Sequence, residues 1–189
     1  MIKIGILGDI GSGKSFVAKQ FKLPVFNADE EIIKIYKSNK KCFYKLQKIL
    51  PKYIKSFPVE KKELGRSILD NYKNLKKISK VVHPIIRVEM RKFLINNKQK
   101  KMVILDIPLL IENKLNNKKD ILIYVDSKKK DIQKRLVKRK GYNKKLIKNF
   151  KKIQWSLFKK KRLSNYIIKN NFKPTTIKKK VEIIKKKIL

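Results

Sequence analysis

The sequence has little of several residue types, and each shortage excludes a class of protein. Its 189 residues include one cysteine, Cys42, and one histidine, His83. A single cysteine excludes an internal disulfide framework and a cysteine-based zinc site. No apolar run reaches the roughly 18 residues of a membrane-spanning helix, and the N-terminus carries no signal-peptide cleavage region. We therefore expect a cytoplasmic protein without a membrane partner.

Acidic residues are also scarce, with 14 Asp and Glu against 53 Lys and Arg, which gives a formal net charge of +39. Such a charge is typical of nucleic-acid binding. Lysine supplies nearly all of it, however: the chain has 47 Lys but 6 Arg, together with 28 Ile, 14 Asn and 2 Ala. Lys, Ile and Asn have A/T-rich codons, so drift of an A/T-rich genome explains the profile. We expect no specific nucleic-acid partner, and a basic nucleic-acid-binding protein is the less favoured alternative.

Short apolar runs alternate with helical patterns along the chain. They cover residues 2–7, 23–26, 102–107, 121–125 and 166–168. Buried strands that alternate with helices predict an α/β fold, in which a parallel sheet is the middle of three layers.

A long span without such runs, about residues 30–95, is helical in pattern, with breaks near Asn39, Pro51, Pro58 and His83-Pro84. We interpret it as a helical insert in one domain that covers the whole chain. The core is then formed by about 1–29 and 100–189.

The strongest motif is the run from Gly8 to Ser15, GDIGSGKS, which fits G-x-x-x-x-G-K-[ST] at every fixed position. This composition gives roughly 0.003 matches by chance in a chain of this length. An apolar run precedes the motif and a helical pattern follows it, as a phosphate-binding loop requires. Its glycines, Gly11 and Gly13 among them, let backbone N–H groups approach phosphates.

The polar side chains of this loop have separate roles. Lys14 places a positive charge on the β- and γ-phosphates of a nucleotide, and the Ser15 hydroxyl can ligate Mg²⁺. Backbone N–H groups of Ser12 and Phe16 can also face phosphates, while the Phe16 side chain is expected to pack. The sequence thus predicts an ATP site that contains Mg²⁺.

Further motifs resemble those of the dephospho-CoA kinase family, in order and spacing over essentially the whole chain. They are Gly11–Ser15, Val25–Asp29, His83-Pro84, Asp106–Asn113, Arg135 with Arg139, Gln154 with Lys160, and Asn165–Asn170. The resemblance implies transfer of the ATP γ-phosphate to the ribose 3′-hydroxyl of dephospho-CoA, the last step of coenzyme A biosynthesis. It also implies a P-loop kinase core, a helical substrate-side insert and a lid.

In that family the second acid of a D-A-D motif is the catalytic base, and the motif reads Asn27-Ala28-Asp29 here. The resemblance therefore gives Asp29 this role, while Asn27 departs from the pattern. A carboxylate at Asp29 can orient the acceptor hydroxyl and take its proton. A helix N-cap is the structural alternative for Asp29.

Asp106 ends an apolar run, as an acid that holds Mg²⁺ does, and a helix cap is equally compatible with its position. Family resemblance assigns substrate binding to a further set of positions: Asp29, Lys61, His83, Pro108, Leu109 and Glu112. Lys61 stands where the family usually has arginine, which keeps the charge and loses the planar fork.

Two arginines stand out in a chain that uses lysine almost everywhere. Arg135 and Arg139 are four residues apart, which predicts that they share one helix face. Planar guanidinium groups suit phosphate, so we assign both to ATP binding and give Arg139 a catalytic role. With Lys140 and Gly141 nearby, we expect a lid over about residues 135–155.

One alternative on the same fold stays open, a nucleoside or nucleotide kinase. Its acceptor pocket would need a base-reading amide or arginine, which the sequence does not reveal. For the oligomeric state we expect a monomer or a weak oligomer.

Overall fold

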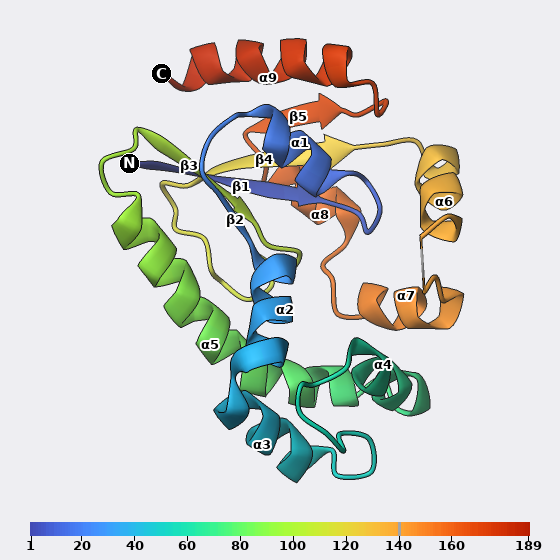
Figure 1. Cartoon of the computed structure of the whole chain (residues 1–189). Helices are drawn as coiled ribbons and strands as arrows, with labels where there is room; N and C mark the ends of the chain where they lie inside the picture. The colour runs from blue at the N-terminus through green and yellow to red at the C-terminus, as the bar shows by residue number, and fades with distance from the viewer. Residues whose placement is uncertain (140) are drawn as a thin grey trace. The chain divides into compact units, whose positions relative to one another are not determined.

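The computed structural model describes residues 1–139 and 141–189 (Figure 1). Its strands are β1 (Ile2–Gly8), β2 (Val25–Asn27), β3 (Met102–Asp106), β4 (Ile121–Asp126) and β5 (Tyr166–Lys169). Its helices are α1 (Lys14–Gln20), α2 (Ala28–Ser38), α3 (Lys40–Ile49), α4 (Lys61–Asp70), α5 (Asn74–Asn96), α6 (Lys129–Val137), α7 (Lys144–Lys151), α8 (Leu157–Arg162) and α9 (Pro174–Ile188).

The strands form one sheet in the order β2-β3-β1-β4-β5, and every neighbouring pair is parallel. Each of the five predicted apolar runs is one of these strands. The predicted three-layer α/β fold is therefore confirmed. β1 lies in the centre, where Ile4 and Ile6 are completely buried. Because the strands are parallel, their carboxyl ends meet at one edge, which is where ligands bind in open α/β sheets.

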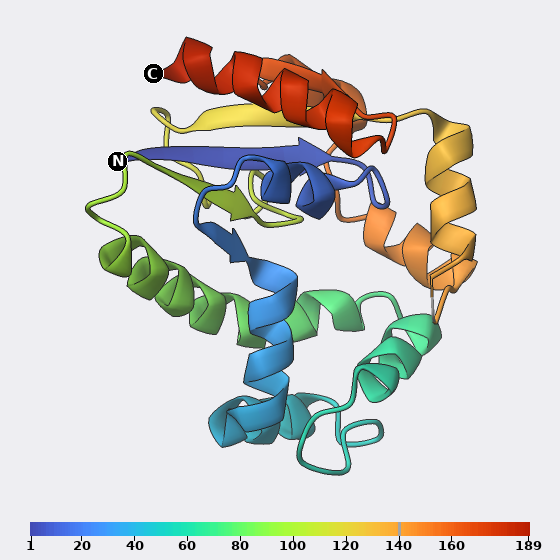
Figure 2. The same cartoon turned by 45° about the horizontal axis from the view of Figure 1, so that its top comes forward.

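Helices flank this sheet and bury their apolar sides against it. Val17 and Phe21 of α1 and Val181 of α9 join Ile4 and Ile123 of the strands in one core cluster. Figures 1 and 2 show α9 running alongside β5, and α8 packs against β1. The layers follow from strands that are apolar on both faces and helices that carry one apolar stripe.

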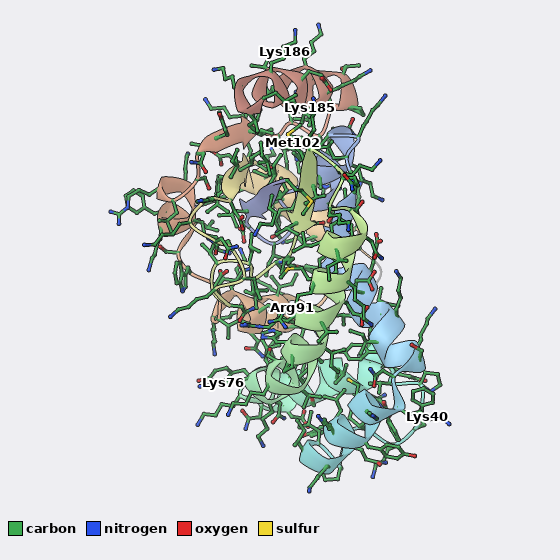
Figure 3. The ribbon with its side chains drawn as sticks, turned by 90° about the vertical axis from the view of Figure 1, so that its left-hand side faces the viewer. Lys40, Lys76, Arg91, Met102, Lys185 and Lys186 are labelled. Carbon is green, nitrogen blue, oxygen red and sulfur yellow. The ribbon has the colours of Figure 1, made fainter. Side chains whose placement is uncertain are left out.

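The chain divides into two compact units. The sheet unit contains residues 1–27, 96–142 and 154–189, and the helical unit contains residues 28–95 and 143–153. The segment expected to form a lid is thus shared, because α6 belongs to the sheet unit and α7 to the helical unit. Exposed lysines occur on both units, for example Lys40 and Lys76 on the helical unit and Lys186 on the sheet unit (Figure 3).

Within the helical unit, the expected break at His83-Pro84 is wrong: α5 continues through Pro84 to Asn96. One face of α5 is buried along its length, including Ile78, Val82 and Ile86. Burial of this apolar stripe outweighs the cost of a proline inside the helix. In the same unit, Asn149 Nδ2 of α7 donates to the carbonyl of Ile68 in α4, at 3.1 Å.

Candidate active site

The phosphate loop, Gly8–Ser15, joins β1 to α1 at the carboxyl edge of the sheet. Its backbone closes on itself where Ser12 N donates to Asp9 O at 3.1 Å. Two side chains from other parts of the sheet unit donate to Ser12 O: Ser127 Oγ and Asn170 Nδ2, each at 2.8 Å. Two distant segments, together with the hydrogen bond within the loop, thus fix its conformation.

Gly13 occupies a position that admits no side chain. Its φ is +89°, and a Cβ there would lie 2.5 Å from Asn170 Nδ2 and 2.8 Å from Phe172 Cε1. Asn170 is buried and Phe172 is half-buried, so neither can readily withdraw. The loop needs glycine here for its backbone conformation and for space.

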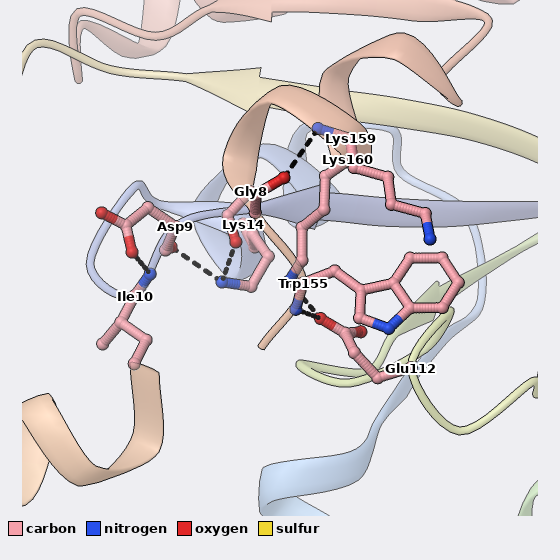
Figure 4. A network of polar contacts seen from close by, with 9 residues as sticks. Gly8, Asp9, Ile10, Lys14, Glu112, Trp155, Lys159 and Lys160 are labelled. Carbon is pink, nitrogen blue, oxygen red and sulfur yellow. Dashed lines mark hydrogen bonds and ion pairs between the residues drawn. The ribbon is translucent and has the colours of Figure 1, made fainter. Parts of the chain in front are cut away.

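Lys14 Nζ donates to carbonyl oxygens of its own loop, to Gly8 O at 3.3 Å and to Asp9 O at 2.9 Å (Figure 4). Its ammonium therefore lies at the concave side of the loop, where phosphates would sit. The Ser15 side chain is exposed, and Phe16 packs against the core as expected. In the same loop, Asp9 Oδ1 accepts a hydrogen bond from Ile10 N at 2.7 Å.

Arg135 lies against the turn that follows β5. Its guanidinium carbon is 4.2 Å from the centre of the Phe172 ring, a cation–π contact, and Phe172 also borders Gly13. Through Phe172, Arg135 is therefore close to the phosphate loop. The sequence did not single out Phe172, whose φ of +61° is unusual for a non-glycine residue.

The expectation that Arg135 and Arg139 share a helix face is wrong. α6 ends at Val137, and Arg139 lies beyond it in a turn in which Arg139 N donates to Leu136 O at 3.1 Å. Gly141, further along, has a φ of +76°. Arg139 is exposed, and Lys140 lies outside the described residues.

The ends of β2 and β3 bring Asn27 and Asp106 side by side, because the two residues are register partners. Asn27 Nδ2 donates to Asp106 Oδ2 at 3.3 Å, and Asp106 is only 3% exposed. A carboxylate at the sheet edge with an amide neighbour suits a hard cation. No cluster of three or more His, Cys, Asp or Glu suited to a metal occurs within 1–139 and 141–189.

Asp29 is exposed and is the second residue of α2, at the start of the helical unit. It lies inside the helix, so the N-cap alternative does not hold. Among acids of the first turn it interacts favourably with the helix dipole. Lys61 begins α4 and is exposed. His83 is half-buried in α5; burial, and then the charge of Arg87, lower its pKa below the usual 6.5.

Glu112 lies in the turn that follows β3, after the half-buried Pro108 and Leu109. Its Oε1 accepts from Lys160 Nζ at 2.7 Å and from Trp155 N at 3.0 Å (Figure 4). This ion pair is buried, with the Lys160 side chain 1% and the Glu112 side chain 6% exposed. In the sequence, Lys160 stands out only by its spacing from Gln154, and no local pattern indicates that it pairs with Glu112.

The sheet unit thus brings together most of the predicted ATP-site residues. The glycines, Ser12, Lys14 and Ser15 form one loop, and Arg135 adjoins it through Phe172. Asp106 stands at the same sheet edge. The predicted acceptor-side residues Asp29, Lys61 and His83 belong to the helical unit instead.

Comparisons with known proteins agree with one another. A family model described as dephospho-CoA kinase matches residues 2–175. A dephospho-CoA kinase from Zymomonas mobilis is 28% identical and covers 90% of this chain and 88% of its own length. Another from Geobacillus kaustophilus is 31% identical, with 90% and 88% covered. The solved structure of a Campylobacter jejuni dephospho-CoA kinase superposes with a TM-score of 0.61 at 20% identity, covering 98% of this chain and 96% of that one, which supports the fold. No described helix is long and apolar enough to cross a membrane.

Proposed function

This chain belongs to the dephospho-CoA kinase family, and we propose that it transfers the γ-phosphoryl group of ATP to the ribose 3′-hydroxyl of dephospho-CoA. Kinase chemistry and the use of ATP follow from the family. The observation that carries the proposal is the complete phosphate loop, with Lys14 on its concave side and Arg135 beside it.

In the proposed reaction, the 3′-oxygen of the acceptor forms a bond to the γ-phosphorus. The bond from that phosphorus to the β–γ bridging oxygen breaks, and ADP leaves. Asp29 takes the proton of the hydroxyl. The loop N–H groups, Lys14 and Arg139 hold the phosphoryl charge as it moves.

Mg²⁺ is the proposed metal, with Ser15 Oγ and Asp106 as its protein ligands. Mg²⁺ ordinarily takes one or two carboxylates plus phosphate oxygens and water, so the absence of a larger acidic cluster among the described residues fits. The bound ion would neutralise phosphate charge. The Asn27→Asp change tests this placement, because it sets a second carboxylate beside Asp106. We expect the variant to have a lower melting temperature than the wild type in the absence of Mg²⁺. Added Mg²⁺ should then raise the melting temperature of the variant by several degrees more than it raises that of the wild type.

The remaining sequence assignments stay parts of the proposal. Dephospho-CoA is contacted by five of these residues: Lys61, His83, Pro108, Leu109 and Glu112. The segment 135–155 acts as a lid that excludes water, which would otherwise hydrolyse ATP.

The direct experiment measures ADP release from ATP-Mg²⁺ in parallel with dephospho-CoA, adenosine, AMP, CMP and no acceptor. We expect release with dephospho-CoA alone. The Lys14→Ala variant should lose about 100-fold or more in rate, because it removes a charge that holds the transferring group. ADP release only with a nucleoside or nucleotide would mean that dephospho-CoA is not the acceptor, and it would leave the fold assignment unchanged.

Asp29→Asn tests the base separately. The change keeps size and hydrogen bonding but removes the proton acceptor, so we expect kcat to fall about 100-fold or more, with KM for ATP unchanged. The exposed neighbour Glu30→Gln is the matched control. An Asp29→Asn protein with full turnover would remove the base from the mechanism.

A further inference from the structure

The two carboxylate oxygens of Glu112 have different surroundings. Oε1 accepts two hydrogen bonds, from Lys160 Nζ and from Trp155 N. Oε2 is buried as well, and it has no hydrogen-bond partner among residues 1–139 and 141–189. The ammonium of Lys160 in α8 and the backbone N–H of Trp155, just before α8, therefore bind the same oxygen and leave the other without a donor (Figure 4).

A buried carboxylate oxygen without a hydrogen-bond donor is unusual. Buried polar atoms are nearly always hydrogen-bonded, and one left without a donor lowers stability. A lysine placed between the two oxygens would serve both. Here Lys160 and Trp155 share Oε1, so the arrangement keeps Glu112 in one orientation and leaves Oε2 as a buried acceptor without a donor.

The position of Glu112 narrows down what that donor is. The turn that carries it follows β3 directly, at the carboxyl edge of the parallel sheet, where ligands bind. A carboxylate oxygen repels the triphosphate of ATP, whose place is the cationic phosphate loop. A neutral donor, a hydroxyl or an N–H group, is the chemistry that fits.

We propose that Lys160 is a positioning residue: it fixes Glu112 so that Oε2 accepts a hydrogen bond from a hydroxyl or N–H group of the acceptor substrate. This rests on the proposed function, because dephospho-CoA is taken as the acceptor. Lys160 touches no reacting atom and acts through Glu112.

Three variants test the proposal. Glu112→Gln keeps an oxygen for Lys160 and Trp155 and turns the open acceptor position into an N–H donor. Lys160→Met removes the charge and retains the packing volume. The double variant combines them. Lys161→Met is the matched control, since Lys161 is the next residue of α8 and forms only an exposed ion pair with Asp126 at 3.0 Å.

We expect Glu112→Gln to raise KM for dephospho-CoA about tenfold, with KM for ATP within about twofold, because a hydrogen bond to a charged group is lost. Lys160→Met should raise the same KM by a similar factor, and the double variant should add little to either change. Lys160→Met alone should also melt lower than the double variant, which no longer buries an unpaired carboxylate. Lys161→Met should match the wild type.

Glu112→Gln with wild-type KM for both substrates would overturn the contact at Oε2 and leave a purely structural pair. Additive effects on KM in the double variant would overturn the role of Lys160. If Lys160→Met alone does not fold, the KM of the double variant is compared with that of Glu112→Gln, and a further large rise overturns the role in the same way. A wild-type protein that phosphorylates a different acceptor would refute the proposed function instead. The KM values of the Glu112 and Lys160 variants are then compared for that acceptor. If no acceptor is turned over, calorimetric Kd values of the same variants for dephospho-CoA replace KM in the comparison.

Discussion

The phosphate loop and the turn from Arg139 to Tyr142 both contain a glycine with positive φ and a cation suited to phosphate, but they are supported very differently. Gly13 is enclosed by Asn170 and Phe172, whereas a Cβ on Gly141 would meet no atom of residues 1–139 and 142–189 within 4 Å. Lys14 is hydrogen-bonded to its own loop, whereas Arg139 is exposed.

From this difference we expect two ways of binding phosphate in the sheet unit. The loop is organised in advance by buried hydrogen bonds, so little ordering remains to be paid for when a nucleotide binds. In the turn after α6, none of the described residues packs around Gly141, and we expect the arginine of this turn to be placed when the ligand is present. The following variants test that contrast.

Gly13→Ala should have the largest effect. A side chain there adopts an unfavourable φ and approaches Asn170 Nδ2 to 2.5 Å. We expect a loss of about 1–3 kcal/mol in the free energy of unfolding and about 100-fold in kcat/KM. Urea unfolding and steady-state kinetics measure the two. Near-normal kinetics would mean that the loop is not fixed by its surroundings.

Asn170→Ala should come second. The change removes the 2.8 Å hydrogen bond to Ser12 O and the acceptor of Phe172 N, also at 2.8 Å. Ser12 O keeps the hydrogen bond from Ser127 Oγ, but the half-buried Phe172 N loses its acceptor. We expect a stability loss of about 1–3 kcal/mol and about a tenfold higher KM for ATP. The exposed neighbour Asn171→Ala serves as the control, and an equal rise in its KM would contradict a specific role for Asn170.

Phe172→Leu should have a smaller effect, because it removes the ring under Arg135 and retains an apolar side chain. A cation–π contact at a partly exposed site is worth about 0.5–1 kcal/mol. We expect KM for ATP to rise about two- to fivefold, with kcat nearly constant. Arg135→Lys should raise KM for ATP by a similar factor. If Arg135→Lys raised this KM and Phe172→Leu did not, the ring would have no part in placing the charge.

Gly141→Ala should have the smallest effect. The added Cβ meets no atom of the described part of the chain, so the cost in stability comes from the strained φ and is about 1 kcal/mol. We expect kcat/KM within about threefold of the wild type. A loss as large as that of Gly13→Ala would show that the two glycines are equally constrained and would refute the contrast.

Several features of the site could be predicted from the sequence because their cause is local. The strands were found because buried parallel strands are short continuous apolar runs. The phosphate loop was found because its fixed residues are adjacent in the chain. The break at Pro84 was predicted on the same local grounds and is wrong, since burial of Ile78, Val82 and Ile86 along α5 outweighs the local preference.

Other features depend on residues that are distant in the chain. Asn170 lies 158 positions from Ser12, and Ser127 lies 115 positions from it. The end of α6 at Val137 separates Arg139 from Arg135, although their spacing alone predicted a shared face. These outcomes depend on how strands and helices pack, which spacing along the chain does not encode.

By itself, the sequence determined the α/β class, the phosphate loop with Lys14 and the resemblance to the dephospho-CoA kinase family, because each is carried by residue types in fixed local order. Only the tertiary structure decided which side chains hold that loop and which carboxylate Lys160 binds. The order β2-β3-β1-β4-β5 brings the turn after β3 and helix α8 together, and a buried ion pair exists only where two distant segments exclude water from both charges.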